Sequence, residues 1–226
     1  MNERTNEILS DLFSKKLLII AGHYGTGKTN VAVSMSVYMA KAGHKTSIVD
    51  LDIVNPYFRM ADNAGYVKQF GVRPIVPEYA NTNVDMPTLP YEFYSVFDSD
   101  GKAVLDVGGD DDGAVVLATH KEKIEKSGYK MVFVYNKYRL SISDPADALQ
   151  MMRDIEASSD LKFCGIINNS NLGAETTPEI IEDSVKYADE LSRLSGLPVL
   201  CTTVLKRITV GIPGVIYIED ATKKLF

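Results

Sequence analysis

Gly22-His23-Tyr24-Gly25-Thr26-Gly27-Lys28-Thr29 has the pattern G-x-x-x-x-G-K-[ST] of a phosphate-binding loop, or P-loop. The apolar run Leu17–Ala21 precedes it and a helix-like stretch from Asn30 to Lys41 follows it, which is the strand–loop–helix setting that the motif requires. In such a loop consecutive backbone N–H groups point at phosphate oxygens, and the helix N-terminus adds the positive end of its dipole. The octapeptide therefore predicts a nucleotide-binding site.

Two side chains of the loop carry specific expectations. Lys28 is expected to reach the β- and γ-phosphates and to act in catalysis, and the Thr29 hydroxyl is expected to ligate Mg²⁺. The residues expected to contact the nucleotide here are Gly22, His23, Tyr24, Gly25, Thr26, Gly27, Lys28, Thr29 and Asn30.

Carboxylates stand at the ends of two further apolar runs. Asp50 and Asp52 end one run, and Asp106 ends another, followed by Gly108 and Gly109. Ligands of open α/β sheets bind at the carboxyl ends of the strands, so these carboxylates should converge on the phosphates. Asp106 fits the Walker B acid that holds Mg²⁺, with Asp52 as a further candidate ligand. The glycine pair would let its loop approach the γ-phosphate closely and contact the nucleotide.

The composition is that of an ordinary globular protein. Of the 226 residues 45% are apolar, and the formal net charge is −6, which argues against binding nucleic acid. We expect one nucleotide-binding domain over residues 1–226, with residues 1–15 as a short helix packed on it. No apolar stretch reaches membrane-spanning length, no signal peptide is visible, and the two cysteines are isolated. The expectation is a cytoplasmic protein that does not bind membranes.

Short apolar runs alternate with segments of helical period, which predicts a three-layer, doubly wound α/β fold with a mostly parallel sheet of about 7–8 strands. Strands are expected at Leu17–Ala21, Thr46–Leu51, Arg73–Pro77, Ala103–Val107, Met131–Tyr135, Phe163–Ile167, Pro198–Thr203 and Val215–Ile218. Helices are expected at Lys28–Ala42, Pro87–Phe97, Asp112–Ser127, Pro145–Ser158 and Pro178–Leu194, with Asp144 and Thr177 as N-caps of the last two. Residues 55–83 show no regular period, and their aromatics favour a packed layer over a mobile loop.

The P-loop, the D-x-D at Asp50–Asp52 and the D-x-G-G at Asp106–Gly109 together resemble the MinD/ParA/CooC-type P-loop ATPases. This group includes the ArsA, Mrp and nitrogenase iron-protein branches, and the resemblance spans roughly Lys16 to Thr203. It implies that Asp52 orients the attacking water and that Asp50 supports the adjacent loop.

The resemblance also implies that a strand-end asparagine reads adenine. Asn168 and Asn169 stand at that position, and Asn169 fits the pattern slightly better. A guanine reader of the form N-K-x-D is disfavoured, because Arg139 occupies the place of its aspartate in Asn136–Arg139. ATP, ADP and Mg²⁺ are the expected ligands.

One departure from the family concerns the signature lysine, which in many members reaches the partner's nucleotide across a dimer. His23 holds that position, and a neutral imidazole does not replace a permanent cation. Arg59, Lys137 or Arg139 could stabilise phosphate charge only by moving in or by coming from another subunit.

The resulting functional hypothesis is a Mg²⁺-dependent, slow ATPase that acts as a nucleotide-dependent switch for a protein partner, with a nucleotide-dependent homodimer left open. A small-molecule kinase or ligase resembling dethiobiotin synthetase is one alternative, with Tyr57, Arg59 and Asn81–Asn83 as candidate acceptor contacts. A nucleotide-loaded scaffold that does not hydrolyse its ligand is another.

Overall fold

Eight parallel strands form one sheet in the order β3-β2-β4-β1-β5-β6-β7-β8. The structure, a computed structural model, describes residues 3–52, 60–76, 91–109 and 111–220. The strands are β1 Leu17–Ala21, β2 Thr46–Leu51, β3 Arg73–Ile75, β4 Lys102–Val107, β5 Tyr129–Tyr135, β6 Gly165–Asn168, β7 Val199–Leu205 and β8 Val215–Ile218. The predicted α/β fold with a parallel sheet is confirmed.

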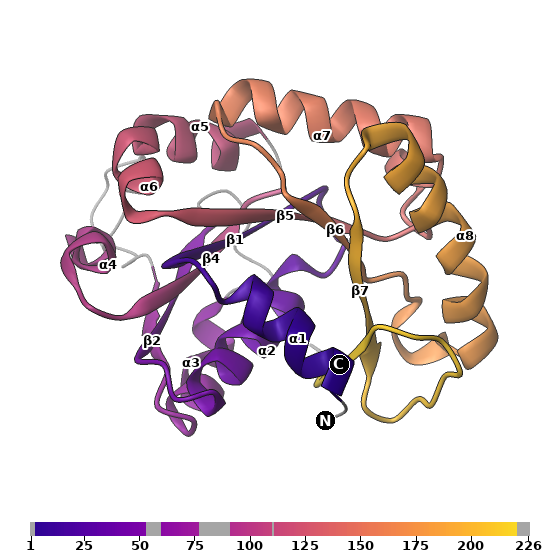
Figure 1. Ribbon diagram of the computed structural model, residues 1–226, viewed down its shortest axis with the longest axis horizontal. Coiled ribbons are helices and arrows are strands. Elements are labelled where there is room, and N and C mark those ends of the chain that lie inside the picture. Colours follow the sequence, from indigo (N-terminus) through magenta and orange to yellow (C-terminus); the bar gives the residue numbers. More distant parts are fainter. Residues whose placement is uncertain (1–2, 53–59, 77–90, 110, 221–226) are drawn as a thin grey trace.

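Helices cover both faces of this sheet, which makes three layers (Figure 1). The α-helices are α1 Glu3–Leu12, α2 Lys28–Lys41, α3 Met60–Lys68, α4 Ser95–Asp98, α5 Asp111–Thr119, α6 Lys121–Ser127, α7 Pro145–Ser159 and α8 Pro178–Ser195. Short 3₁₀ helices lie at Tyr91–Tyr94 (η1), Leu140–Ile142 (η2) and Gly173–Glu175 (η3). Helices α1–α3 pack on one face, and α4–α8 pack on the other.

Strand β1 shows why both faces need covering. Leu17 and Ile19 are fully buried against the α4–α8 layer, and Leu18 and Ile20 are fully buried against the α1–α3 layer. Successive side chains of a strand point to opposite faces, so a continuous apolar run belongs at the centre of a sheet covered on both sides. This burial holds the P-loop, which follows β1 directly, at the middle of the sheet edge.

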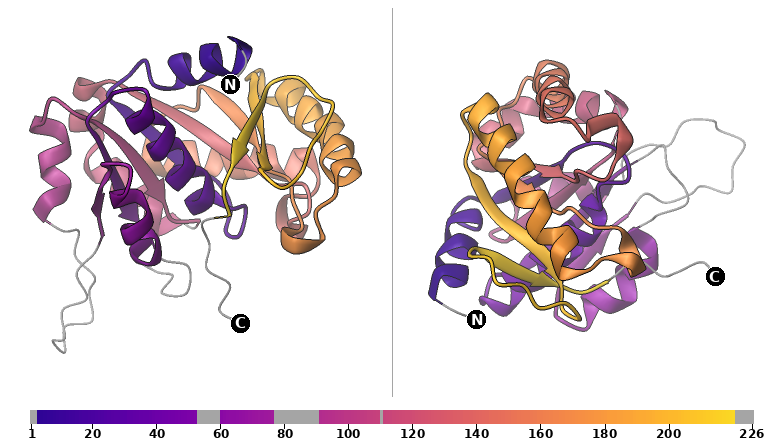
Figure 2. Two further views of the ribbon diagram at one scale, coloured as in Figure 1. Left: turned by 90° about the horizontal axis from the view of Figure 1, so that it is seen from below. Right: turned by 90° about the vertical axis from the view of Figure 1, so that its right-hand side faces the viewer.

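The N-terminal helix α1 packs on the sheet. Leu9 and Leu12 of α1 and the following Phe13 are buried in the α1–α3 layer. The Thr5 hydroxyl donates to the carbonyl oxygen of Val215 at 3.3 Å, which ties α1 to β8. Figure 2 shows these two elements, indigo and yellow, side by side.

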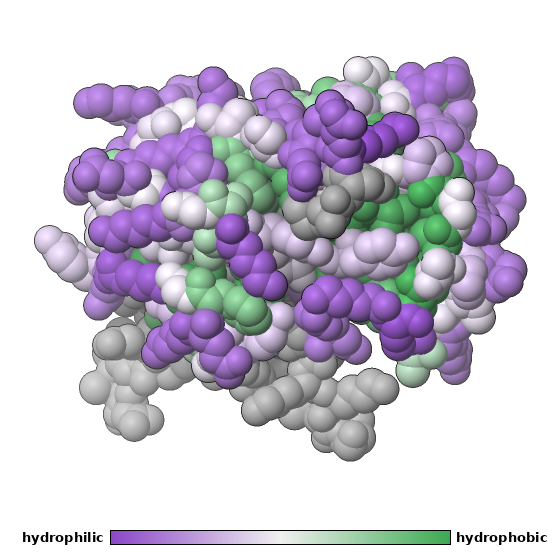
Figure 3. Space-filling view, turned by 60° about the horizontal axis from the view of Figure 1, so that its bottom comes forward, coloured by the Kyte–Doolittle hydropathy of each residue, from purple (hydrophilic) through white to green (hydrophobic). Residues whose placement is uncertain are grey.

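One outer face combines a charged and an apolar region. Figure 3 shows apolar atoms gathered over the segment between β7 and β8, beside the hydrophilic surface of α1. Ile208 and Val215 are buried in this region, and Val210 and Ile212 are packed against them.

None of the described helices is long and apolar enough to cross a lipid bilayer.

Three local predictions were wrong. Helix α3 lies inside the stretch expected to be irregular, and Val67 on it is fully buried in the core, so tertiary packing outweighs Gly65 within the helix. The helix expected over Asp112–Ser127 is divided into α5 and α6 at His120, whose backbone is not helical and whose ring packs edge-on against Phe93. The helix expected at Pro87–Phe97 is the 3₁₀ turn η1 followed by the single turn α4, and residues 87–90 lie outside the described part.

The two predicted N-caps are confirmed. The Asp144 carboxylate accepts from the backbone N–H of Ala146 at 2.8 Å, and the Thr177 hydroxyl accepts from that of Ile180 at 3.4 Å. Proline at the first helical position follows each cap. Strand β6 begins at Gly165 rather than at Phe163, a shift of the size expected for element ends.

Candidate functional site

The P-loop connects β1 to α2 and wraps around the start of that helix. Gly27 is the N-cap of α2 with φ 85°, a left-handed conformation that favours glycine, and its carbonyl oxygen accepts the first helical bond, from Val31, at 3.1 Å. A side-chain carbon on Gly27 would also collide with the amide nitrogen of Asn169. This position therefore requires glycine for both conformation and space.

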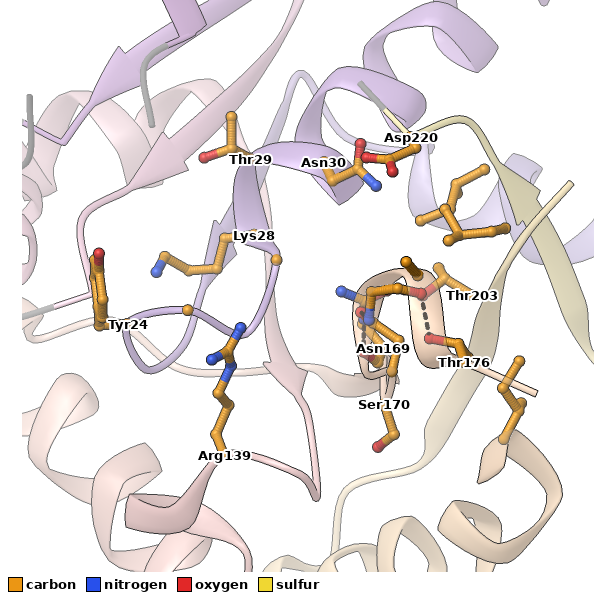
Figure 4. A pocket seen from close by; sticks show the side chains of 18 of the residues that line it. Tyr24, Lys28, Thr29, Asn30, Arg139, Asn169, Ser170, Thr176, Thr203 and Asp220 are labelled. Atoms are coloured by element: carbon orange, nitrogen blue, oxygen red, sulfur yellow. Dashed lines mark hydrogen bonds between the residues drawn. The ribbon is translucent and has the colours of Figure 1, made fainter. Parts of the chain in front are cut away.

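Three donors of the loop meet on one carbonyl oxygen. The His23 oxygen accepts from the backbone N–H of Thr26 at 3.3 Å, from the Thr26 hydroxyl at 2.8 Å and from Lys28 Nζ at 3.2 Å. The Lys28 side chain is buried and lies over the loop, as Figure 4 shows. Its ammonium group is thus held close to the loop backbone by the His23 carbonyl oxygen.

The two predicted carboxylates on the strand ends are neighbours. Asp50 on β2 pairs in register with Asp106 on β4, and both are buried. Burial, together with the charge of Asp50, raises the pKa of Asp106 to about 7, against the lowering effects of Lys28 and of a hydrogen bond with Thr29. Among the described residues, Asp106 Oδ1 is a buried atom without a hydrogen-bond partner. A buried acceptor of this kind is suited to a cation.

The protein residues of this site could supply only part of the coordination shell of Mg²⁺, with the rest coming from phosphates and water. The described residues contain no cluster of three or more His, Cys, Asp or Glu side chains arranged to hold a metal. The Thr29 side chain is a hydrogen-bond partner of the Asp106 carboxyl group, and Oδ1 of that group has no partner among the described residues, so hard oxygen atoms of both residues lie in one place. Mg²⁺ in nucleotide sites is held by one or two protein oxygens, with phosphates and waters completing the octahedron. The donor set agrees with that arrangement.

The loop after β4 packs directly on the P-loop. A side-chain carbon on Gly109 would lie 2.5 Å from the backbone nitrogen of Tyr24 and 2.9 Å from Lys28 Nζ. Only glycine allows this approach of Gly109 to the P-loop. Asp52 stands nearby, and its backbone N–H donates to Asp50 Oδ1 at 3.0 Å, so that Asp50 shapes the turn after β2.

A cavity of about 430 Å³ opens at this edge of the sheet (Figure 4). Ile181, Leu205 and Ile218 form an apolar part of its wall, and polar groups of the P-loop lie opposite. The predicted site residues that line it are Tyr24, Gly25, Gly27, Lys28, Thr29, Asn30, Asp52 and Asn169. Gly22, His23, Thr26, Asp106, Gly108, Gly109 and Asn168 are not among the lining residues.

The two strand-end asparagines have different surroundings. Asn168 is fully buried and bonds to Ser184 and Ser170 inside the protein. Asn169 lines the cavity, donates through Nδ2 to the carbonyl oxygen of Thr26 at 2.7 Å, and accepts from the Thr203 hydroxyl at 2.6 Å. Asn169 therefore braces the P-loop, and its amide keeps one N–H and one lone pair for a ligand.

His23 does not enter the cavity. Its Nδ1 lies 2.9 Å from the carbonyl oxygen of Tyr24, and its side chain is half-buried. The tautomer in which Nδ1 carries the proton makes this a local hydrogen bond. This geometry matches a hydrogen-bonding role for the residue at the signature-lysine position.

Sequence reasoning missed several cavity residues. Asp220 reaches the cavity just after β8, and Ser170 and Asn171 line it from the loop after β6. Arg139 also lines it from the same chain, although the sequence suggested that it would need to move in. The end of β8 could have pointed to Asp220, but no local pattern marks the others. Tyr57, Arg59 and Asn81–Asn83, proposed as acceptor contacts, lie outside the described residues.

No protein-family model matches this sequence, and no curated protein matches it. Similarity is found among solved structures. Cell division protein FtsY from Thermotoga maritima is 16% identical with a TM-score of 0.57, covering 89% of this chain and 69% of that one. FtsY from Mycoplasma mycoides is 18% identical with a TM-score of 0.55, covering 90% and 65%. Signal recognition particle 54 kDa protein from Aeropyrum pernix, in complex with GDP, is 14% identical with a TM-score of 0.53, covering 92% and 46%.

At sequence identities this low, the similarity to these structures shows a common fold only. The chain has the fold of the P-loop NTPases, with the P-loop at the centre of the sheet edge. It spans about two thirds of the two FtsY chains and less than half of the signal recognition particle protein.

Proposed function

We propose that this chain binds Mg²⁺·ATP in the cavity beside the P-loop and hydrolyses it slowly, as a nucleotide-dependent switch for a protein partner. One observation carries the proposal. Lys28 and Thr29 lie at the start of α2, next to a buried carboxylate oxygen of Asp106 that has no partner among the described residues. A Mg²⁺-bound triphosphate would satisfy that oxygen and the loop donors together.

The phosphates would be held mainly by main-chain groups. The N–H groups at the start of α2 have no intrahelical partners and would donate to phosphate oxygens. Lys28 would transfer its hydrogen bond from the His23 carbonyl to the β- and γ-phosphates, a short movement from its present position. Bound Mg²⁺ would neutralise phosphate charge, held by Thr29 and Asp106 with Asp52 close by.

Hydrolysis would depend on placing a water molecule. Asp52 lines the cavity at the end of β2, and its carboxylate would accept a hydrogen bond from the attacking water. Phosphoryl transfer needs positioning and charge stabilisation more than covalent chemistry, so a single oriented carboxylate is sufficient for slow turnover.

Adenine is the base that we propose, read by the remaining N–H and lone pair of Asn169. The base would lie against Ile181, Leu205 and Ile218, which supply an apolar surface for its ring. Asp220 lines the same cavity, and its carboxylate is the kind of acceptor that guanine would use. Direct competition between ATP and GTP therefore decides the base.

The switch role is supported by the contact between the two loops. Gly109 packs against Tyr24 and Lys28, and α5 begins at Asp111, two residues later. A γ-phosphate bound by Lys28 would lie next to the contact between Gly109 and the P-loop, and it would shift the segment that leads into α5. We further propose membership of the MinD/ParA/CooC-like group, as a member in which His23 replaces the signature lysine. A protein partner or a second copy of the chain would bind to the conformation that the nucleotide induces.

The test compares Lys28→Ala with Lys126→Ala, which removes the same charge from the exposed last turn of α6. Titration with a fluorescent ATP analogue and phosphate release in Mg²⁺ without any acceptor would be measured for both variants. We expect Lys28→Ala to lose binding and phosphate release, and Lys126→Ala to retain both. Binding of equal strength in parent and Lys28→Ala would overturn the assignment of the cavity.

A further inference from the structure

Arg139 extends from the loop after β5 over the P-loop of its own chain. A side-chain carbon on Gly25 would lie 3.1 Å from Arg139 Cζ, 3.1 Å from Nε and 3.4 Å from Nη1. Gly25, Arg139 and Lys28 all line the cavity, and Figure 4 shows the guanidinium group beside the loop. Two cations from distant parts of the sequence thus face one phosphate-binding loop.

The guanidinium group is available to a ligand. The described part of the chain contains no hydrogen-bond acceptor or carboxylate paired with the Arg139 side chain, which is exposed. Its neighbour Lys137 is committed elsewhere, because its Nζ lies 2.7 Å from Asp183 and 3.6 Å from the centre of the Tyr187 ring. Of the two cations proposed in this loop, Arg139 is the one directed at the cavity.

The loop that carries Arg139 is held firmly by its neighbours. Asn136 Oδ1 accepts from the backbone N–H of Tyr138 at 3.0 Å, and the backbone N–H of Lys137 donates to the Ser170 hydroxyl at 3.0 Å. The Tyr138 hydroxyl donates to the carbonyl oxygen of Ile180 on α8 at 2.8 Å. These hydrogen bonds tie the loop to the segment after β6 and to α8, so the backbone that carries Arg139 is already in place and only the side chain has to be ordered by a ligand.

We propose that Arg139 binds the terminal phosphate of a nucleoside triphosphate in cis and stabilises the negative charge that develops there during hydrolysis. The inference rests on the proposed function of the cavity. A planar guanidinium group offers several donors to phosphate oxygens and stays charged at all physiological pH values. Arg139 would therefore supply, from within one chain, the cation that His23 does not.

The experiment compares Arg139→Gln and Arg139→Lys with Arg153→Gln, which makes the same change at an exposed position of α7. Single-turnover phosphate release and the affinities for ATP and ADP would be measured for all variants. We expect Arg139→Gln to slow hydrolysis by about 10²-fold or more, as for other arginines that stabilise this transition state. ATP affinity should fall about tenfold and ADP affinity less than about threefold, because the lost charged hydrogen bonds reach the terminal phosphate. Arg139→Lys should recover part of the loss, and Arg153→Gln should match the parent.

Two results would overturn the inference while leaving the proposed function intact. One is a parent that binds and hydrolyses ATP while Arg139→Gln does so equally well. The other is an equal loss of ATP and ADP affinity, which would place Arg139 on the inner phosphates. A parent that binds neither nucleotide would overturn the proposed function itself, and the role of Arg139 with it. Thermal unfolding of each variant shows whether it is folded.

Discussion

The carboxyl group of Asp106 is removed from water by burial. Its carboxyl group lies beside Asp50 under the P-loop, and its pKa is raised to about 7 from an ordinary value of 3.8. The folded protein therefore binds this proton more strongly than the unfolded chain does. The stability from this group is complete below about pH 4, falls as the pH rises through 7, and is constant above that.

Replacing Asp106 by Asn in the nucleotide-free protein should remove this pH dependence. The free energy of unfolding of the variant, minus that of the parent, should grow from near zero at pH 4 to on the order of 2–4 kcal/mol above pH 7. Urea denaturation across this range measures the difference, with Asp100→Asn as an exposed control. A difference that does not change with pH would contradict the raised pKa.

Asn169 combines two tasks in one amide group. It donates to the Thr26 carbonyl oxygen of the P-loop, and it lines the cavity, where we propose that its remaining N–H and lone pair bind adenine. Asn169→Ala should therefore weaken ATP and GTP binding together, with an additional loss for ATP of about 0.5–1.5 kcal/mol from the missing base contact.

The measured quantity for Asn169→Ala is the ratio of ATP to GTP affinity, which should fall relative to the parent. Asp220→Asn provides the comparison, and it should leave ATP affinity nearly unchanged. Tighter GTP than ATP binding in the parent, weakened by Asp220→Asn, would assign base recognition to Asp220 instead.

At the scale of elements, the start of α7 depends on a single side chain. The Asp144 carboxylate accepts from the N–H of Ala146 at 2.8 Å, and α7 packs between α5 and α8. Asp144→Ala should lower the free energy of unfolding by about 0.5–2 kcal/mol, because a helix N–H loses its partner. Asp144→Asn retains an acceptor and should lose much less. Chemical denaturation distinguishes the two, and equal stability of both variants would contradict the capping role.

Helices α3, α5 and α6 show where local patterns are insufficient. Val67 on α3 is fully buried, so the core stabilises a helix whose own composition is weak. The rings of Phe93 and Tyr94 pack on His120 between α5 and α6, and they come from a segment more than twenty residues earlier. Contacts of this kind outweigh helical propensity, which contributes only fractions of a kcal/mol per residue.

At the scale of the whole molecule, the site joins elements from both halves of the sheet. The cavity is lined by residues of the P-loop, of the turn after β2 and of the ends of β6, β7 and β8. A nucleotide that contacts all of them should stabilise the entire fold against unfolding. At a free concentration of about 100 times Kd, we expect the free energy of unfolding to rise by about 2.7 kcal/mol.

This stabilisation is measured by denaturant titration with and without Mg²⁺·ATP. Lys28→Ala should show no rise at the same nucleotide concentration. A parent whose denaturant midpoint is unchanged at this concentration would contradict nucleotide binding to the folded state, and an equal rise in Lys28→Ala would indicate binding that does not depend on the P-loop lysine.

The sequence by itself determined the fold class, the P-loop and the carboxylates at the strand ends. These features are local, because a P-loop consists of consecutive residues and because parallel strands place their carboxyl ends at one edge of a sheet. Its resemblance to a known family also pointed to Asn168 and Asn169 as candidates.

Only the tertiary structure brought Arg139, Asp220 and the apolar wall of Ile181, Leu205 and Ile218 to the same cavity. These residues lie on separate elements, and the strand order β5-β6-β7-β8 together with the packing of α8 sets their distances. Such positions depend on which distant surfaces pack together, a free-energy balance over the whole chain that short-range patterns do not encode.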